Sequence, residues 1–192
     1  MTVFVLATHN AHKVEELRRI LGERLGPHEL VAYDGPEPVE DGDTFEANAL
    51  IKARAAFAHT GLPAIADDSG IAVRALGGAP GIHSARYAGT RDDADNYRLL
   101  LANLQGATDR AAEFVCAAAL VDGERELTVR GSWPGDVLDA PRGDHGFGYD
   151  PVFRPAGLEI SSAELTADQK NATSHRARAF GELVVHIREL YG

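Results

Sequence analysis

Hydrophobic and polar residues along this chain follow two spacings. Clustered or alternating β-forming residues predict strands, and apolar residues that recur every three or four positions predict helices. The acidic, proline-rich residues 34–42 predict a connector, and the glycines within residues 77–81 predict a loop with unusual backbone angles. In chain order, the expected elements are a strand at 2–8, a helix at 13–21, a strand at 29–33, a helix at 45–58 with capping-box spacing from Asp43 to Glu46, short strands at 64–66 and 71–73, a helix at 92–105, strands at 111–121 and 126–133 around a turn at Asp122–Gly123, and a last helix that Thr173 or Ser174 caps and that runs to Leu190.

The order of these elements indicates the fold class. Strands that alternate with helices are typical of an α/β protein, and a hairpin in the middle of such a chain indicates a mixed sheet. The 192 residues, of which 44% are hydrophobic and 25% charged, are enough for one sizeable core. We therefore expect one domain over residues 1–192, without internal repeats.

Composition disfavours several classes of function. The chain carries 29 acidic and 19 basic residues, a net charge of −10, whereas a general nucleic-acid binder presents a basic face. A local cluster of Lys and Arg could still bind a small anion. Cys116 is the only cysteine and lies in an apolar run, so we expect a buried core residue. No stretch reaches membrane-spanning length, and residues 3–7 are too short for a signal-peptide core, so we expect a cytoplasmic protein.

Two adjacent carboxylates, Asp67 and Asp68, follow the apolar run 64–66 and precede Ser69 and Gly70. Side chains alternate along a strand, so at least one carboxylate should point toward a sheet end or a cleft, where an unpaired charge is unfavourable. Mg²⁺, held by one or two carboxylates and by substrate phosphates, would balance that charge. On local composition alone, the four residues fit a solvated turn better.

The segment Thr8–Lys13 groups hydroxyl, amide and ammonium groups at a predicted strand-to-helix turn. The free backbone N–H groups of a helix start bind anions well. The spacing is not that of a P-loop, and Thr and Asn also cap many helices that bind nothing. Further along, four acidic residues could join Asp68 at a metal ion, or form a solvated loop, and a lysine follows them: Glu40, Asp41, Asp43, Glu46 and Lys52.

Two segments near the C-terminus suit a purine nucleotide. Within residues 146–151, glycines allow close approach to a flat ligand, and Phe147 or Tyr149 could stack on a base. A tight turn with a core aromatic residue is the alternative. Lys170 and the segment Ser174–Arg176 concentrate donors near a helix start, where they suit a phosphate or a purine oxygen.

Taken together, these segments resemble one family, the non-canonical purine nucleoside triphosphate pyrophosphatases, also called inosine triphosphatases or XTP/dITP diphosphatases. The motifs occur in family order from residue 6 to residue 176, and the ordered set is specific. The matching motifs are Leu6–Lys13, Thr44–Ala49 with Lys52–Ala53, Ala66–Gly70, Leu76–Gly81 with Ser84–Tyr87, Gly131–Trp133, Gly146–Pro151, Ala163–Thr166 and Ser174–Arg176.

The resemblance implies a homodimeric α/β protein with an elongated mixed β-sheet flanked by helices, and two lobes around a central nucleotide cleft. It also implies Mg²⁺-dependent hydrolysis of ITP, dITP and XTP to the monophosphate and pyrophosphate. By position, Asp68 would be the proton acceptor and a metal ligand. The substrate-binding residues carried over are Thr8, His9, Asn10, Ala11, His12, Lys13, Lys52, Ser69, Phe147, Gly148, Tyr149, Asp150, Lys170, His175 and Arg176.

The second metal ligand carried over is Glu40. Many relatives have two acidic residues before a Thr-Gly pair here, whereas this chain reads Val39-Glu40-Asp41-Gly42, so Asp41 or Glu46 could take its place. Donors from Arg176 or His175 would favour purines with a 6-oxo group over adenine. Two alternatives stay open: a pyrophosphatase for other modified nucleotides, and a nucleotide sensor without hydrolysis. The role of Asp67 is left open.

Overall fold

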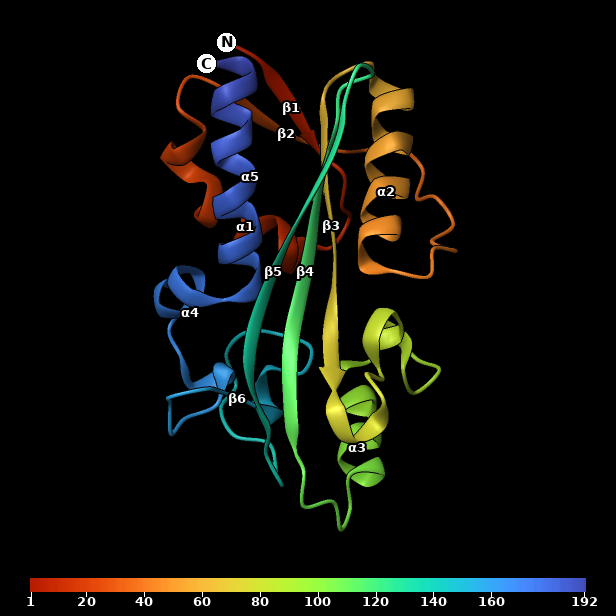
Figure 1. Ribbon diagram of the computed structural model, residues 1–192, viewed down its shortest axis with the longest axis vertical. Coiled ribbons are helices and arrows are strands. Elements are labelled where there is room, and N and C mark those ends of the chain that lie inside the picture. Colours follow the sequence, from red (N-terminus) through yellow and green to blue (C-terminus); the bar gives the residue numbers. More distant parts are fainter. The chain divides into compact units, whose positions relative to one another are not determined.

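The computed structural model describes residues 1–192, apart from the side chain of Glu23. Its strands form one six-stranded sheet in the order β2-β1-β3-β4-β5-β6 (Figure 1). Among the described residues, no helix combines the length and the apolar character that a membrane span needs. The strands are β1 (Val3–Leu6), β2 (Glu29–Ala32), β3 (Ala64–Val73), β4 (Ala111–Val121), β5 (Glu126–Val137) and β6 (Phe153–Pro155), and the α-helices are α1 (Ala11–Leu21), α2 (Phe45–Thr60), α3 (Asp93–Asn103), α4 (Ala167–Thr173) and α5 (His175–Tyr191).

The predicted α/β fold with a mixed sheet is confirmed. Strand β1 pairs in parallel with β2 and with β3, whereas β5 pairs antiparallel with β6. Strands β4 and β5 are neighbours joined by the predicted turn, which the N–H of Asp122 closes by donating to the carbonyl of Arg125.

The chain divides into two compact units. The first unit holds residues 1–68, 116–131 and 176–192, and the second holds residues 69–115 and 132–175. Strands β3, β4 and β5 contribute residues to both units. The expectation of a single domain over residues 1–192 stays a prediction.

In the first unit, helices cover both faces of the strands. One core cluster joins the apolar faces of α1 and α5 to β1 and includes Leu17, Phe180 and Phe4, all fully buried. Helix α2 lies on the opposite side of these strands (Figure 1). Its buried positions include Ala49 and Ala53, whose small side chains let the helix lie close to the sheet. Polar side chains on the same face of α2 therefore come close to β3.

In the second unit, an aromatic core supports the loops that follow β5. Phe114 on β4, Trp133 on β5 and Phe153 on β6 belong to one buried cluster, together with Leu100 and Leu104 at the C-terminal end of α3. The short strand β6 lies against β5 with Pro155 opposite Gly135. Neither β6 nor α4 was expected from the sequence, because each is too short for its spacing of apolar residues to be read.

Strand β3 does not end at Asp67 and Asp68, so the expectation of two short strands was wrong, and so was the alternative of a solvated turn. The strand runs on through Gly70, where a Cβ would collide with the carbonyl of Gly81 and the Ser84 hydroxyl. Just beyond, the N–H of Ile71 donates to Ser84 Oγ over 3.0 Å. Tertiary contacts thus hold a turn-like sequence extended.

Two expected helix starts also need correction. Thr44, rather than Asp43, caps α2, because Thr44 Oγ1 accepts from the N–H of Ala47 over 3.1 Å. Helix α1 begins two residues earlier than expected, at Ala11, with Asn10 as its cap. The last helix begins at His175, directly after Ser174.

Candidate active site

Strand β3 directs Asp67 and Asp68 to opposite faces of the sheet, because side chains alternate along an extended backbone. Asp67 meets residues of α1 and α5: its Oδ2 lies 3.0 Å from Lys13 Nζ and 3.5 Å from Arg176 Nε. Asp68 meets residues of α2: its Oδ2 accepts from Asn48 Nδ2 over 3.3 Å, and its Oδ1 lies 3.7 Å from Lys52 Nζ. The first unit thus contains both carboxylates and their cations.

Asp67 is a buried counter-ion. Burial by itself would raise the pKa of its carboxyl group, but the charges of Lys13, Arg176 and Lys52 outweigh burial and hold that pKa well below its ordinary value. Arg176 is paired a second time, because its Nη1 donates to Glu16 Oε2 over 3.0 Å. Asp67 is therefore ionised at neutral pH, and its carboxylate holds two cations.

Asp68 differs from Asp67 in the direction of its pKa shift. Its exposed fraction is 8%. Burial raises its pKa, Lys52 and Lys13 oppose that effect, and the net pKa lies above the ordinary value for an aspartate. A carboxylate with a raised pKa accepts a proton more readily, as long as it remains ionised at the working pH.

Lys52 joins two carboxylates. Its Nζ lies 3.1 Å from Glu40 Oε2 in addition to its approach to Asp68. Burial lowers the pKa of the Lys52 ammonium, but Asp67, Asp68 and Glu40 outweigh burial and the net pKa is raised. Lys52 is thus a protonated cation next to the proposed base.

The acidic residues near the start of α2 lie in different surroundings. Glu40 shares Lys52 with Asp68, whereas Glu46 is engaged by Arg130 Nη1 at 3.2 Å, and Asp41 and Asp43 are exposed. Glu40 and Asp68 thus both approach the Lys52 ammonium, and carboxylate oxygens are ligands that Mg²⁺ takes together with substrate phosphates. Within the described part of the chain, no group of three or more His, Cys, Asp or Glu is placed to hold a metal by itself.

Several backbone donors of the turn Thr8–Lys13 are hydrogen-bonded within the turn itself. Asn10 Oδ1 accepts from the N–H groups of His12 and Lys13 over 3.0 and 3.2 Å, and Thr8 Oγ1 accepts from the N–H of Asn10 over 3.2 Å. The expectation of free backbone N–H groups is therefore wrong for these three donors. His9 Nδ1 lies 3.1 Å from Glu37 Oε1, and Ala11 and His12 are exposed. The one lysine of the turn, Lys13, is paired through its Nζ with Asp67 Oδ2 at 3.0 Å.

In the second unit, Asp150 organises the loop that precedes it. Its buried carboxylate accepts from Lys170 Nζ over 2.6 Å, from the N–H of Phe147 over 3.0 Å and from the Ser162 hydroxyl. Lys170 Nζ also lies 4.9 Å from the centre of the Phe147 ring. Asp150 therefore holds Lys170 next to an aromatic face.

The two aromatic candidates of this loop differ in surroundings. Tyr149 is buried in the core cluster, and its hydroxyl donates to the carbonyl of Ser84 over 2.7 Å. Phe147 is half-buried beside Lys170, and the N–H of Gly148 donates to Asp93 Oδ2 over 2.7 Å. Phe147 is thus the better candidate for stacking on a base.

His175 lies in an aromatic stack. Its ring is parallel to that of Phe114, with the centroids 4.8 Å apart and the planes at 13°, and the Trp133 ring lies 6.4 Å away. His175 is buried, and Ser69, the first residue of the second unit, is half-buried on β3. The stack fixes the plane of the imidazole.

Two site residues carried no role in the sequence prediction, Asn48 and Glu16. Each has a spacing that could have identified it. Asn48 and Lys52 are four residues apart on a helix, so they share a face, and Glu16 follows Lys13 by three residues. Their partners, Asp68 on β3 and Arg176 on α5, are distant in sequence and come close only in the folded protein.

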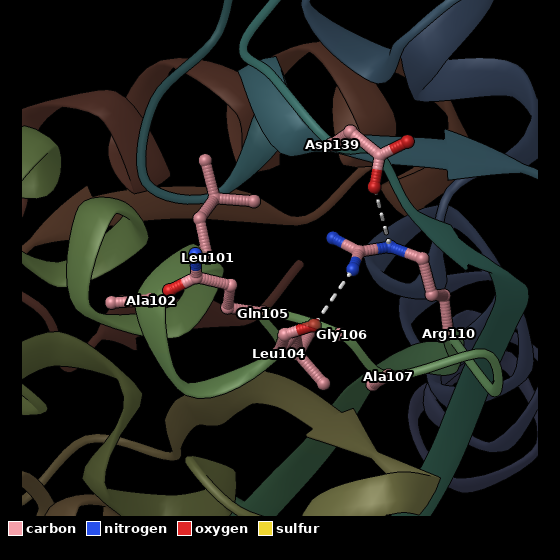
Figure 2. Close-up of a pocket in the computed structure, with 8 residues that line it drawn as sticks. All are labelled: Leu101, Ala102, Leu104, Gln105, Gly106, Ala107, Arg110 and Asp139. Carbon is pink, nitrogen blue, oxygen red and sulfur yellow. Dashed lines mark hydrogen bonds and ion pairs between the residues drawn. The ribbon is translucent and has the colours of Figure 1, made fainter.

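A separate cavity of about 500 Å³ in the second unit contains none of the predicted site residues (Figure 2). It is lined by Arg110 and Asp139, 3.4 Å apart, and by residues 101–102 and 104–107. The Arg110 guanidinium donates to the carbonyls of Leu104, Val137 and Leu138. It therefore links the C-terminal end of α3 to the C-terminal end of β5. Its contacts are those of a structural arginine.

The chain is similar to known proteins over nearly its full length. The model of the Ham1 family matches residues 4–186. A relative from Leifsonia xyli subsp. xyli, named dITP/XTP pyrophosphatase, is 56% identical over 194 residues, which are 99% of this chain and 98% of the relative.

Solved structures show the same similarity. A HAM1 protein from Coxiella burnetii matches with a TM-score of 0.90 at 40% identity, over 98% of this chain and 100% of that one. A protein from Mycobacterium abscessus, described as a nucleoside-triphosphatase / dITP/XTP pyrophosphatase, matches with a TM-score of 0.77 at 46% identity, over 94% of this chain and 98% of that one.

Proposed function

This chain belongs to the Ham1 family, and we propose that it hydrolyses the non-canonical purine nucleotides ITP, dITP and XTP to the nucleoside monophosphate and pyrophosphate. The observation that carries the proposal is the group around Asp68, a carboxylate with a raised pKa that lies beside Lys52 and shares it with Glu40. The names of the Leifsonia and Mycobacterium relatives support the substrate class.

In this proposal, Asp68 accepts the proton of the water that attacks the α-phosphorus. The leaving pyrophosphate gains charge, which Lys52 and Lys13 neutralise. An ammonium carries three N–H donors, so Lys13 can bind a phosphate oxygen while it remains paired with Asp67. The residues Thr8–His12 directly precede Lys13 in the chain and would complete the phosphate-binding turn.

The donor set of Glu40 and Asp68 fits a magnesium ion, because both carboxylates already approach one cation, Lys52. Bound there with substrate phosphates, Mg²⁺ would supply charge neutralisation for the leaving group. Glu46 is the weaker candidate for this role, since Arg130 engages its carboxylate.

The residues of the second unit that are proposed to bind the purine are Phe147, Lys170 and His175. Phe147 supplies a face for stacking, and Lys170 supplies an ammonium that Asp150 orients. Donors from Arg176 or His175 favour a 6-oxo purine, because an adenine amino group would leave them without an acceptor.

The experiment that tests this proposal measures released pyrophosphate, separately from orthophosphate, with ITP, XTP, dITP, GTP, ATP and dTTP in the presence of Mg²⁺. We expect pyrophosphate from ITP, XTP and dITP, and much less from ATP and dTTP. Orthophosphate as the first product would contradict cleavage at the α-phosphorus. Turnover of dTTP instead would favour the wider pyrophosphatase, and the absence of product from all six nucleotides would favour a sensor.

Three further parts of the sequence prediction remain proposals: dependence on Mg²⁺, a homodimer and a cytoplasmic location. The first has a direct test. Removal of divalent ions with EDTA should abolish turnover, and added Mg²⁺ should restore it. Turnover that persists in EDTA would exclude the metal site at Glu40 and Asp68.

A further inference from the structure

Asn48 is a buried polar residue in the otherwise apolar inner face of α2. Its exposed fraction is 3%, and the buried residues that follow it on this helix, Ala49, Ala53 and Ala56, have no polar side-chain atoms. A buried amide is unfavourable unless both of its polar atoms are hydrogen-bonded. Both are: Nδ2 donates to Asp68 Oδ2 over 3.3 Å, and Oδ1 accepts from the N–H of Gly42 over 2.9 Å.

The chemistry of the partners determines which way this amide points. A backbone N–H can only donate, so the atom of Asn48 that faces Gly42 must be the acceptor, Oδ1. The amino group is then left to face Asp68, which must accept. This contact binds one specific oxygen, Oδ2, and leaves Oδ1 as the oxygen that faces Lys52. Asn48 thus makes the two oxygens of the proposed base inequivalent.

The second contact of Asn48 reaches the segment that carries Glu40. Gly42 passes so close to α2 that a Cβ there would lie 2.7 Å from Asn48 Oδ1. Only one residue, Asp41, separates Gly42 from Glu40, which itself contacts Lys52. One side chain therefore ties together Asp68 and the backbone beside the second acidic candidate.

We propose that Asn48 is a positioning residue, which holds the Asp68 carboxylate in the orientation for proton transfer and ties the segment around Glu40 to it. The inference rests on the proposed function, because it assigns Asn48 a role in the step that Asp68 performs. Asn48 acts through Asp68 and is not itself expected to touch the substrate.

Asn96 offers a matched control in the second unit. It is equally buried in a helix, with an exposed fraction of 2%. Its Oδ1 accepts from the N–H of Ala88 over 2.8 Å, and its Nδ2 donates to the carbonyl of Ala85 over 3.2 Å. Its partners, which include the carbonyl of Thr90 at 3.5 Å, are all backbone groups of residues 85–90, and none is a proposed site residue. Substitution of Asn96 therefore reports on the loss of a buried amide alone.

The test compares Asn48→Asp and Asn48→Ala with Asn96→Asp and Asn96→Ala. For each variant, kcat and KM for ITP, the Kd of IMP by calorimetry and the Tm are measured. Asn48→Asp keeps the acceptor for Gly42 but sets an acceptor against Asp68. We expect it to lower kcat by about 10- to 100-fold while KM and the Kd of IMP change by less than about threefold, as for other groups that orient a reacting residue.

Asn48→Ala removes both hydrogen bonds without adding a repulsive one, so its kcat should lie between those of Asn48→Asp and the wild type. The Asn96 variants should lose Tm but retain a kcat within about twofold of the wild type. Should Asn48→Asp fail to fold, Asn48→Ala decides by the same comparison.

Two results would overturn the inference. One is a kcat for the Asn48 variants within twofold of the wild type. The other is a loss of kcat that the Asn96 variants reproduce at equal loss of Tm. The wild-type protein separates failure of this inference from failure of the proposed function. If the wild type releases no pyrophosphate from ITP, the proposed function is refuted; if it does and either result above is found, only the role of Asn48 is refuted.

Discussion

At the scale of the residue, Asp67 and Asp68 illustrate how neighbours in sequence acquire different electrostatic roles. The extended backbone of β3 turns Asp67 toward Lys13 and Arg176 and turns Asp68 toward α2. Three cations lower the pKa of Asp67, whereas burial prevails at Asp68. A carboxylate with a lowered pKa is a poor base and a good counter-ion, so the structure favours Asp68 for proton transfer.

Asp68→Asn should keep the fold and lower kcat for pyrophosphate release by at least about 10²-fold, the usual scale for loss of a general base. The asparagine side chain keeps an acceptor oxygen for Asn48. The variant loses only the charge of a buried carboxylate, and the raised pKa of Asp68 shows that this charge does not stabilise the fold. Steady-state kinetics with ITP measures the effect, and circular dichroism checks the fold. Near-normal turnover would remove Asp68 from the role of base.

At the scale of the element, helix α2 carries Asn48 and Lys52 to β3, and its first turn depends on one hydroxyl. Thr44 Oγ1 accepts from the N–H of Ala47, while Asp43 is exposed next to it. Helix starts leave backbone donors that a side-chain oxygen must satisfy. Which of two adjacent candidates does so depends on backbone geometry at the junction.

Thr44→Ala should lower the free energy of unfolding by about 1 kcal/mol, the usual effect of losing an N-cap. Asp43→Ala is the matched control and should change the free energy of unfolding by less than about 0.5 kcal/mol, as for an ordinary surface substitution. Urea denaturation of the three proteins measures both values. Equal losses, or a larger loss for Asp43→Ala, would contradict the assignment of the cap.

Gly70→Ala should destabilise the protein by about 1–3 kcal/mol, because the added methyl group meets the Gly81 carbonyl and the Ser84 hydroxyl beside β3. Gly181→Ala in α5 is the opposite case. Nothing lies within 4 Å of its added Cβ, so we expect a gain of about 0.5–1 kcal/mol from the higher helix propensity of Ala. Thermal unfolding of the two variants distinguishes crowding at β3 from a general effect of adding a methyl group.

At the scale of the whole molecule, the same carboxylates link stability to pH. The folded-state pKa of Asp67 lies below its unfolded value. The unfolded chain therefore binds a proton at Asp67 more readily than the folded protein does, and stability falls as the pH falls below the unfolded pKa of about 3.9. Asp68 has the opposite sign, because its folded pKa is raised and its ionisation destabilises the folded state as the pH rises.

The wild-type free energy of unfolding should therefore decrease between about pH 5 and pH 2, and Asp67→Asn should show a shallower decrease over that range. The variant should also be less stable at pH 7, by about 3–5 kcal/mol, since Lys13 and Arg176 lose a buried partner. Denaturant titrations at several pH values measure both quantities. Parallel pH profiles for the two proteins would show that Asp67 does not carry the linkage.

The amino-acid sequence by itself determined the α/β class, the mixed sheet, the longer strands and helices other than the full length of β3, and most of the polar residues around Asp67 and Asp68. Periodicity and turn composition depend on neighbours along the chain, so they can be read locally. The family motifs added the proposed roles of Asp68 as the base and of Lys13 and Lys52 as phosphate-binding groups. Local patterns could not show that β3 continues through Asp67–Gly70, because the groups that hold it extended belong to Gly81 and Ser84.

Only the tertiary structure decided how these groups pair. Lys13 and Asp67 are 54 positions apart, Asn48 and Asp68 are 20 apart, and so are Lys170 and Asp150. Such pairs form only when distant elements pack, and burial together with the charges of the partners then shifts their pKa values. The packing of α2, with its small alanines, brings Asn48 to Asp68 and so gives one carboxylate of an adjacent pair the surroundings of a base.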